Sequence, residues 1–158
     1  MEPPPAHPAR PAFTLVEILI VVVILGILAA VVVPRFAGAT DEAKMGAFIA
    51  SLMTYADVCE YFAAREGFYP PDSSSGTMPN GFDTYVDQDE FESPTPLGGV
   101  WDTEFNDSGV TAAVGVHFNG GPVPAFMLQV DEKFDDGDLS TGLFQQLTAD
   151  RFYYIVAP

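Results

Sequence analysis

The stretch from Phe13 to Pro34 constrains this chain more than any other part of its 158 residues. Its sequence is FTLVEILIVVVILGILAAVVVP, and Glu17 is the single charged residue in it. No polar side chain occurs between Ile18 and Val33. A helix rises about 1.5 Å per residue, so this stretch as a helix covers roughly 30 Å, the thickness of a bilayer core. The sequence therefore predicts an apolar helix that needs lipid or other apolar helices around it.

A carboxylate and a proline distinguish this stretch from a plain membrane anchor. Glu17 is expensive to bury among apolar groups, so it is a functional candidate that needs a named partner. Pro34 lacks a backbone N–H and clashes one turn back, while Gly26 lowers helix propensity earlier in the stretch. We therefore expect a kink or local break at Pro34 and a second weak point at Gly26.

The residues in front of the apolar run resemble a known processing site. The segment Arg10-Pro11-Ala12-Phe13-Thr14-Leu15-Val16-Glu17 resembles the cleavage and methylation site of type IV prepilins and type II secretion pseudopilins, and the resemblance extends to Lys44. It implies that a prepilin peptidase cuts between Ala12 and Phe13 and methylates the new amino terminus of Phe13. The family usually has Gly before the cut. Because Ala12 is the next smallest residue, we expect cleavage to survive, at a lower rate.

The resemblance also implies a role for Glu17 and a set of partners. In this family the positively charged amino terminus of a neighbouring subunit, here that of Phe13, pairs with the glutamate and sets the register of a helical filament. The segment 26–34 is implied to unwind when subunits pack. The implied partners are further copies of the chain, prepilin peptidase, an inner-membrane assembly platform and minor pilins or pseudopilins. The implied location is the inner membrane, crossed once, with a cytoplasmic leader and a periplasmic domain, before incorporation into a periplasmic or surface filament.

The chain divides into four expected parts. Residues 1–12 are a proline-rich leader, residues 13–34 the membrane or filament-core helix, residues 35–66 its amphipathic continuation, and residues 67–158 a globular domain. A helix over 13–66 would be about 80 Å long. Its second half carries one apolar face at spacings of four, three, four and three residues, formed by Phe48, Leu52, Tyr55, Cys59 and Phe62. Gly67 follows as a natural helix stop.

The globular part has the pattern of a small antiparallel sheet. Residues 68–98 are rich in Pro, Gly, Ser and Asp and predict a long connection, with a short strand or helical turn at 82–91. Strands are expected at 99–105, 110–118 and 151–156, with a hairpin loop at 106–109. The segment 124–134 fits a strand or a short helix, and we favour the helix. About three strands laid on the amphipathic helix give an α+β, pilin-like fold.

Charge and composition limit the possible functions. Acidic residues number 22 against 6 basic ones, a net charge of −16, which disfavours nucleic acid as a partner. The one cysteine, Cys59, cannot form an internal disulfide and reads as a small core residue. His117 reads as a partly buried or cross-strand residue. No motif of a nucleophilic, metal-dependent or nucleotide-binding enzyme occurs, so we expect no catalytic residue and no enzyme activity.

An acidic segment at 131–142 is a further candidate site. Its sequence is DEKFDDGDLSTG, and clustered carboxylates on a turn supply the oxygen ligands that calcium prefers. The spacing is not that of an EF-hand, because Lys133 occupies a ligand position and no Glu closes the loop. Major pseudopilins, which the chain resembles, often bind calcium in C-terminal loops. A solvated acidic turn is the interpretation we favour, and Asp135, Asp136 and Asp138 are the predicted ligands under the calcium alternative.

The sequence therefore predicts a structural subunit of a helical, type IV-like filament, most consistent with a major-type type II secretion pseudopilin. A type IV pilus subunit for adhesion or motility is the alternative within the class. The lack of a cysteine pair near the C-terminus favours the pseudopilin, because many long-fibre pilins have a disulfide there. An uncut, membrane-anchored periplasmic binding module is the alternative of another class, and it would keep residues 1–12.

Overall fold

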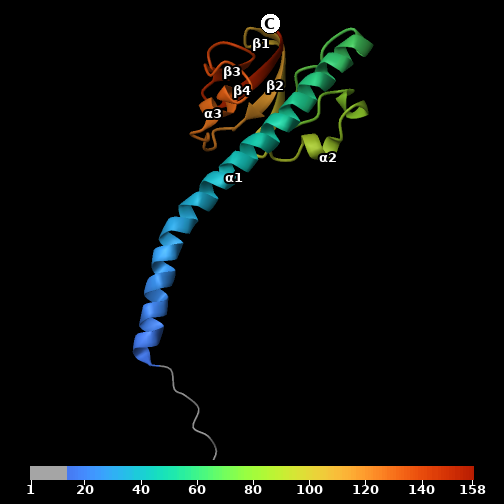
Figure 1. Ribbon diagram of the computed structural model, residues 1–158. Coiled ribbons are helices and arrows are strands. Elements are labelled where there is room, and N and C mark those ends of the chain that lie inside the picture. The colour runs from blue at the N-terminus through green and yellow to red at the C-terminus, as the bar shows by residue number, and fades with distance from the viewer. Residues whose placement is uncertain (1–13) are drawn as a thin grey trace, which may run out of the picture. The chain divides into compact units, whose positions relative to one another are not determined.

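The computed structural model describes residues 14–158, including the side chains of all but residues 31–38. The chain divides into two compact units, Met1–Asp41 and Glu42–Pro158. A helix followed by an antiparallel sheet gives the α+β, pilin-like arrangement that the sequence predicts (Figure 1). In chain order the elements are α1 Leu15–Glu66, η1 Phe82–Thr84, α2 Gln88–Phe91, β1 Val100–Asp107, β2 Val110–His117, α3 Met127–Glu132, β3 Phe144–Thr148 and β4 Arg151–Ala157.

Helix α1 confirms the long predicted helix and its stop. At its end Gly67 adopts φ 84°, and its backbone N–H donates to the carbonyl of Ala63 at 2.9 Å, a left-handed cap that favours glycine. The backbone is helical through Gly26 and Pro34 without interruption. The Pro34 side chain lies outside the described residues, and the predicted weakness of 26–34 on packing stays a prediction.

The amphipathic half of α1 packs onto the sheet as predicted. All five residues of its apolar face are buried, and Phe48 and Leu52 are completely so. The Phe48 ring stacks on Trp101 of β1 with centroids 5.4 Å apart, and Tyr55 meets the same indole edge-on at 4.8 Å. Offset and edge-to-face pairs of this kind add to the gain from burial. This aromatic contact fixes α1 against one face of the sheet within the unit Glu42–Pro158.

The sheet has four strands in the order β1-β2-β4-β3, all antiparallel. The three predicted strands are confirmed, and β3 is an addition that the sequence analysis missed. Its sequence, FQQLT, contains two glutamines and resembles a loop, but pairing with β4 satisfies its backbone groups. Phe144 anchors the strand, because its ring is fully buried against Phe48 and Phe152.

The connections resolve the ambiguous segments. The β1–β2 hairpin closes tightly through Ser108 and Gly109, both with positive φ, so Asn106 and Asp107 belong to the strand rather than to the predicted loop. The segment 82–91 forms two short helical turns, η1 and α2, instead of a strand. The segment 124–134 contains helix α3, which confirms the favoured interpretation.

Candidate functional site

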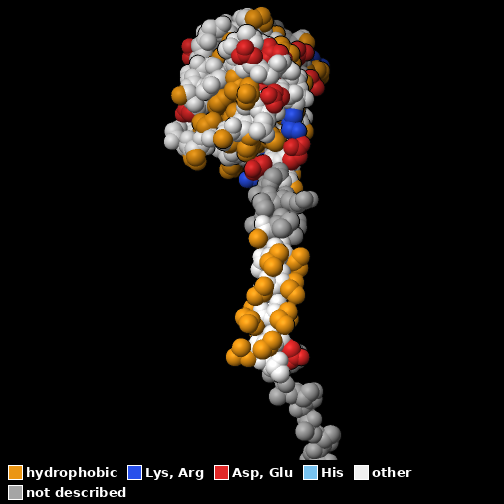
Figure 2. All heavy atoms as spheres, turned by 60° about the vertical axis from the view of Figure 1, so that its left-hand side comes forward, with side chains coloured by type: hydrophobic (Ala, Val, Ile, Leu, Met, Phe, Trp, Pro, Cys, Tyr) orange, Lys and Arg blue, Asp and Glu red, His pale blue; other side chains and the backbone are white. Residues whose placement is uncertain are grey.

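The first candidate site is the apolar surface of α1. Between Leu15 and Leu28, the large hydrophobic side chains are half exposed or more, and Leu15 reaches 82% (Figure 2). They are Leu15, Val16, Ile18, Leu19, Ile20, Val21, Val22, Val23, Ile24, Leu25, Ile27 and Leu28. Among the residues whose side chains are described, no helix is both long enough and apolar enough to span a bilayer. An apolar surface of this size indicates contact with a membrane or with other proteins.

Glu17 and Thr14 form a reciprocal cap at the start of α1. The Glu17 carboxylate accepts hydrogen bonds from the backbone N–H and the hydroxyl of Thr14, both at 2.9 Å. In return the Glu17 N–H donates to the Thr14 hydroxyl at 3.3 Å. This capping box satisfies backbone donors that a helix N-terminus otherwise leaves free. Glu17 therefore has a local structural role that sequence analysis missed, although the spacing Thr-x-x-Glu signals it.

The structure describes only some of the other site residues predicted in this segment. Ala12 and Phe13, the predicted cleavage and methylation residues, lie outside the described residues. Gly26 lies in α1 with no heavy atom within 4 Å of the position that a Cβ would take. Among the described residues, no contact therefore depends on its lack of a side chain.

The second candidate site is the acidic loop between α3 and β3. Asp131 in α3, Asp135 and Asp136 each bring a carboxylate oxygen within 4.8 Å of the others. Asp131 has no exposed surface, and neither of its oxygens has a hydrogen-bond partner within the described part of the chain. Burial, and then the charges of Asp135 and Asp136, raise the pKa of Asp131 against the opposing effect of the backbone N–H groups of Gly137 and Asp138. An unpaired buried carboxylate beside two others is costly unless a cation or a proton neutralises it.

Two of the three predicted calcium ligands, Asp135 and Asp136, belong to this cluster, and both also hold the loop through hydrogen bonds. Asp135 accepts backbone hydrogen bonds from Phe144, at 2.7 Å, and from Leu143. Asp136 accepts from the Asp138 N–H and the Thr141 hydroxyl, both at 2.8 Å.

Asp138 faces a different neighbour. Its carboxylate accepts from the hydroxyl and the N–H of Ser140, at 2.6 and 3.0 Å, and these bonds lower its pKa. Asp138 thus lies outside the clustered group, and Asp131 is the member that sequence analysis did not assign. The position of Asp131, four residues before Asp135 at a helix end, was the available signal.

A third group, buried on the face of the sheet opposite α1, was not predicted. Asp102 and Glu104 alternate along β1 and are each only 2% exposed. The Tyr153 hydroxyl on β4 donates to Asp102 at 2.6 Å and also contacts Glu104 at 3.0 Å. Arg151 pairs with Glu104 at 2.5 Å and lies 3.6 Å from Asp102. Two buried carboxylates thus share one hydroxyl and one guanidinium, which makes the network sensitive to loss of either.

Gly115 makes this network possible. On β2 it lies between Asp102 and Tyr153 in the register of the sheet. A Cβ at this position would lie 2.0 Å from the carbonyl oxygen of Phe152 and 2.6 Å from the Cα of Tyr153. The absence of a side chain therefore allows the close approach of β4 and leaves the way across β2 open to the Tyr153 ring.

His117 and Ser75 extend the network toward the connection before β1. Ser75 Oγ donates to Asp102 Oδ2 at 2.8 Å and lies 2.7 Å from His117 Nδ1. His117 Nε2 lies 3.3 Å from Asp150. His117 is partly buried, as predicted. Because the Ser75 hydroxyl donates its one proton to Asp102, that proton is not directed at His117 Nδ1.

Comparison with known proteins supports the interpretation of the N-terminal segment. The family model of the prokaryotic N-terminal methylation motif matches residues 9–33. No curated protein and no solved structure matches the chain significantly. The motif implies a prepilin peptidase substrate and a filament-forming pilin anchored in the membrane. The match covers residues 9–33, and together with the helix and the antiparallel sheet it supports a type IV pilin-like protein or pseudopilin.

Proposed function

We propose that this protein is a major-type subunit of a type II secretion pseudopilus, polymerised through α1. One observation carries the proposal: a methylation motif lies at the start of a helix whose large apolar side chains are exposed. Burial of each such side chain is worth about 1.5–3 kcal/mol relative to water, so the free segment needs lipid or identical helices around it. The expected division is the leader 1–12, the filament-core helix 13–34, the amphipathic helix 35–66 and the globular domain 67–158.

The choice of a pseudopilus over a type IV pilus rests on cysteine content. The chain has a single cysteine, Cys59, which is buried and free. No disulfide within the chain can therefore hold the C-terminal region together, as one does in many long-fibre pilins. A pilus subunit for adhesion or motility stays the alternative.

Glu17 is the proposed register residue. In a filament its carboxylate leaves water and pairs with the methylated amino terminus of Phe13 of a neighbouring subunit. A subunit out of register would bury this charge unpaired, which is strongly unfavourable. The capping contacts with Thr14 hold the carboxylate at the helix start, where it can meet that amino group. Unwinding of 26–34, between Gly26 and Pro34, is proposed to accompany packing.

The proposed location follows from the same helix. Before assembly the chain crosses the inner membrane once, with the leader in the cytoplasm and the globular domain in the periplasm. Prepilin peptidase, an inner-membrane assembly platform and minor pseudopilins are the proposed partners. The net charge of −16 argues against nucleic acid as a partner of the domain.

A structural role rather than a catalytic one is part of the proposal. Within the described part of the chain, Ser75, His117 and Asp150 form a hydroxyl–imidazole–carboxylate arrangement. The Ser75 hydroxyl donates to Asp102, so it is not activated by His117. These contacts hold the connection before β1 against the sheet.

A calcium site is the second part of the proposal. Three carboxylates converge at Asp131, Asp135 and Asp136, and neither carboxylate oxygen of Asp131 has a hydrogen-bond partner in the described part of the chain. Calcium prefers such oxygen ligands and accepts irregular geometry. The cation would neutralise the cluster and hold the loop between α3 and β3, whereas Asp138, which is bonded to Ser140, would not be a ligand.

The first experiment is the intact mass and N-terminal sequence of the protein from its native membrane. A start at Phe13 with one added methyl group is expected and supports filament assembly. An intact Met1 would instead indicate the anchored binding module, and a start just after Ala29 or Ala30 would indicate a secreted soluble domain. Electron microscopy of filaments sheared from the same cells would then separate short periplasmic assemblies from long surface fibres.

A further inference from the structure

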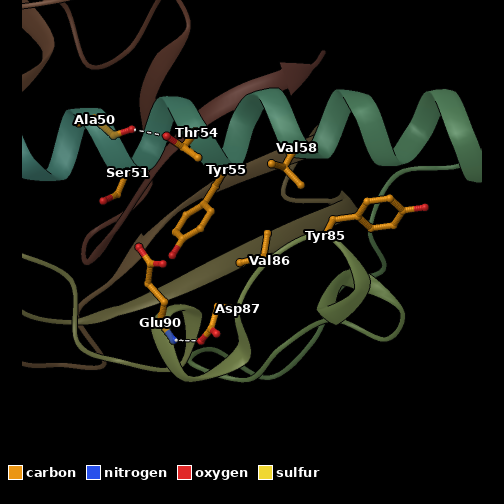
Figure 3. Close-up of a pocket in the computed structure, with 9 residues that line it drawn as sticks. All are labelled: Ala50, Ser51, Thr54, Tyr55, Val58, Tyr85, Val86, Asp87 and Glu90. Atoms are coloured by element: carbon orange, nitrogen blue, oxygen red, sulfur yellow. Dashed lines mark hydrogen bonds between the residues drawn. The ribbon is translucent and has the colours of Figure 1, made fainter.

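A pocket lies between the second half of α1 and the segment around α2. Its volume is about 290 Å³, and its lining includes Ser51, Tyr55 and Val58 from α1 with Asp87 and Glu90 from the α2 region (Figure 3). The pocket lies entirely within the unit Glu42–Pro158. Its walls combine apolar surface with hydroxyl and carboxylate groups.

Tyr55 is the residue that demands an explanation in this pocket. Its side chain is 3% exposed, and its hydroxyl has no hydrogen-bond partner within the described residues. Figure 3 shows the ring extending from α1 toward Glu90. Burial, and then the charges of Glu90 and Asp87, raise the pKa of Tyr55 to about 12, so the hydroxyl keeps its proton. A buried hydroxyl without a partner costs free energy that a ligand group can recover.

The charges of the pocket indicate what would fill it. Asp87 caps α2 through a hydrogen bond from the Glu90 N–H at 3.1 Å, whereas the Glu90 carboxylate has no hydrogen bond or ion pair among the described residues. Two carboxylates, a tyrosine hydroxyl and an apolar wall match an ammonium group on a hydrocarbon stem. A lysine side chain has this chemistry.

Charge pairing within the described part of the chain points to one lysine. Lys133 pairs with Glu42 at 2.6 Å, and Arg151 pairs with Glu104. Arg65 lies over the Tyr61 ring at 5.9 Å. Of the described basic side chains, only Lys44 has no ion pair, hydrogen bond or ring contact, and it is exposed. With 22 acidic and 6 basic residues, copies of this chain can form few ion pairs with one another. A lysine without an ion pair and an acidic pocket are complementary in charge, so they are candidates for one of these pairs.

We propose that the pocket at Tyr55, Asp87 and Glu90 receives the Lys44 side chain of a second copy of this chain. This inference rests on the proposed filament function and names one contact within it. Lys44 and the pocket are different patches of the same subunit, so their contact is heterologous and leads to an open helical assembly. On parallel helices, Lys44 and Thr54 at the pocket differ by about 15 Å along the axis, which is the stagger that the contact requires.

Charge reversal in the full chain, in its native host, tests the contact. Lys44→Glu and Glu90→Lys are each expected to reduce the yield of sheared filaments about tenfold, because like charges then meet. The double variant is expected to restore the yield to near the wild-type level. Asp89→Lys is the matched control: Asp89 neighbours Glu90 on α2 but does not line the pocket. It should leave the yield unchanged and should not rescue Lys44→Glu.

Disulfide trapping identifies the occupant directly. Lys44→Cys combined with Glu90→Cys should give disulfide-linked dimers and higher oligomers in native membranes. Cys59 can stay in place, because it is 2% exposed and burial raises its pKa to about 12. Lys44→Cys alone and Glu90→Cys alone should not form these products.

The outcomes separate this inference from the proposed function. One outcome is that the wild type forms filaments while the double-cysteine variant gives no cross-link and the double charge variant restores no yield. That result would overturn the contact and leave the filament function standing. A disulfide within one chain would show that Lys44 serves its own pocket and would also overturn the proposal. A wild-type protein that forms no filament at all would contradict the proposed function, and this contact with it.

Discussion

The Tyr153 hydroxyl donates a 2.6 Å hydrogen bond to the carboxylate of Asp102 across the intervening strand β2. Both side chains are buried, and they lie 51 residues apart in the sequence. The bond joins the first strand of the sheet to β4, which β1 does not contact directly. It therefore links directly two strands that pair with β2 but not with each other.

Removing this hydroxyl should destabilise the domain. Tyr153→Phe leaves Asp102 and Glu104 without their shared donor, and we expect a loss of about 1.5–3 kcal/mol in the free energy of unfolding. Urea unfolding of the full chain in detergent, followed by circular dichroism, measures this loss. Tyr154→Phe is the control, with an expected change within about 0.5 kcal/mol. Equal stability of the two variants would show that the network contributes little.

The pH dependence of stability should carry the signature of Glu104. Burial raises the pKa of Glu104 above its usual range, against the opposing effect of Tyr153 and Arg151. A carboxyl with a raised pKa in the folded state binds its proton more tightly there than in the unfolded state, so its contribution to stability falls as pH rises. The stability of wild type relative to Glu104→Gln should therefore decrease from about pH 4 upward.

Asp150 provides a contrast of opposite sign. The backbone N–H of Gly120 donates to its carboxylate at 2.9 Å and, as the largest cause, lowers its pKa. The stability of wild type relative to Asp150→Asn should therefore fall as pH decreases below about 4. Denaturant unfolding between pH 3 and 8 measures both differences, and parallel pH profiles for the two variants would contradict the assignment.

Calcium should stabilise the protein through Asp131. At a hundred times its dissociation constant, bound calcium raises the free energy of unfolding by about 2.7 kcal/mol. Asp131→Asn should lose this gain, but without calcium at neutral pH it should be more stable than wild type, because it removes an unpaired buried charge. Thermal unfolding with calcium, magnesium or chelator measures both effects.

Asp138→Asn decides the ligand set of this loop. The contacts of Asp138 with Ser140 predict that the variant keeps the calcium response. Loss of the response would restore Asp138 as a ligand, as the sequence analysis predicted. Equal unfolding temperatures of the wild type with calcium and with chelator would remove the calcium site altogether.

Assembly should depend on the charge of Glu17. Glu17→Ala is expected to block filament formation without preventing membrane insertion, because the neighbouring amino terminus loses its partner. Glu17→Gln keeps groups that can bond to Thr14 but carries no charge, so we expect it to fail as well. Sheared-filament yield and the membrane fraction are the two readouts. Normal filaments from Glu17→Gln would mean that capping, rather than charge pairing, is what assembly requires.

Much of the fold was predictable because it depends on local patterns. The spacing of Phe48, Leu52, Tyr55, Cys59 and Phe62 predicts the buried face of α1. Gly67 predicts the end of that helix, alternation predicts β1 and β2, and a run of aromatic and β-branched residues predicts β4. Strand β3 was missed because its glutamines give no apolar alternation, and only pairing with β4 makes it a strand.

The candidate sites divide in the same way. The N-terminal motif around Glu17 could be predicted from adjacent residues, because a peptidase binds a short segment of chain and a helix cap forms between residues three positions apart. The acidic loop was found by its composition, but its unpartnered member, Asp131, was not distinguished from its neighbours. Burial is the property that distinguishes it, and burial depends on what the rest of the chain packs against.

The sequence by itself determined the apolar helix, its methylation motif and the α+β order of elements. These follow from side-chain periodicity and from short motifs, which act over a few turns of helix or one strand. Only the tertiary structure decided the Tyr153 network, the unpartnered Asp131 and the pocket at Tyr55. Each of these depends on polar groups that lie far apart in the sequence and lose their water together, and no local pattern records which groups will meet.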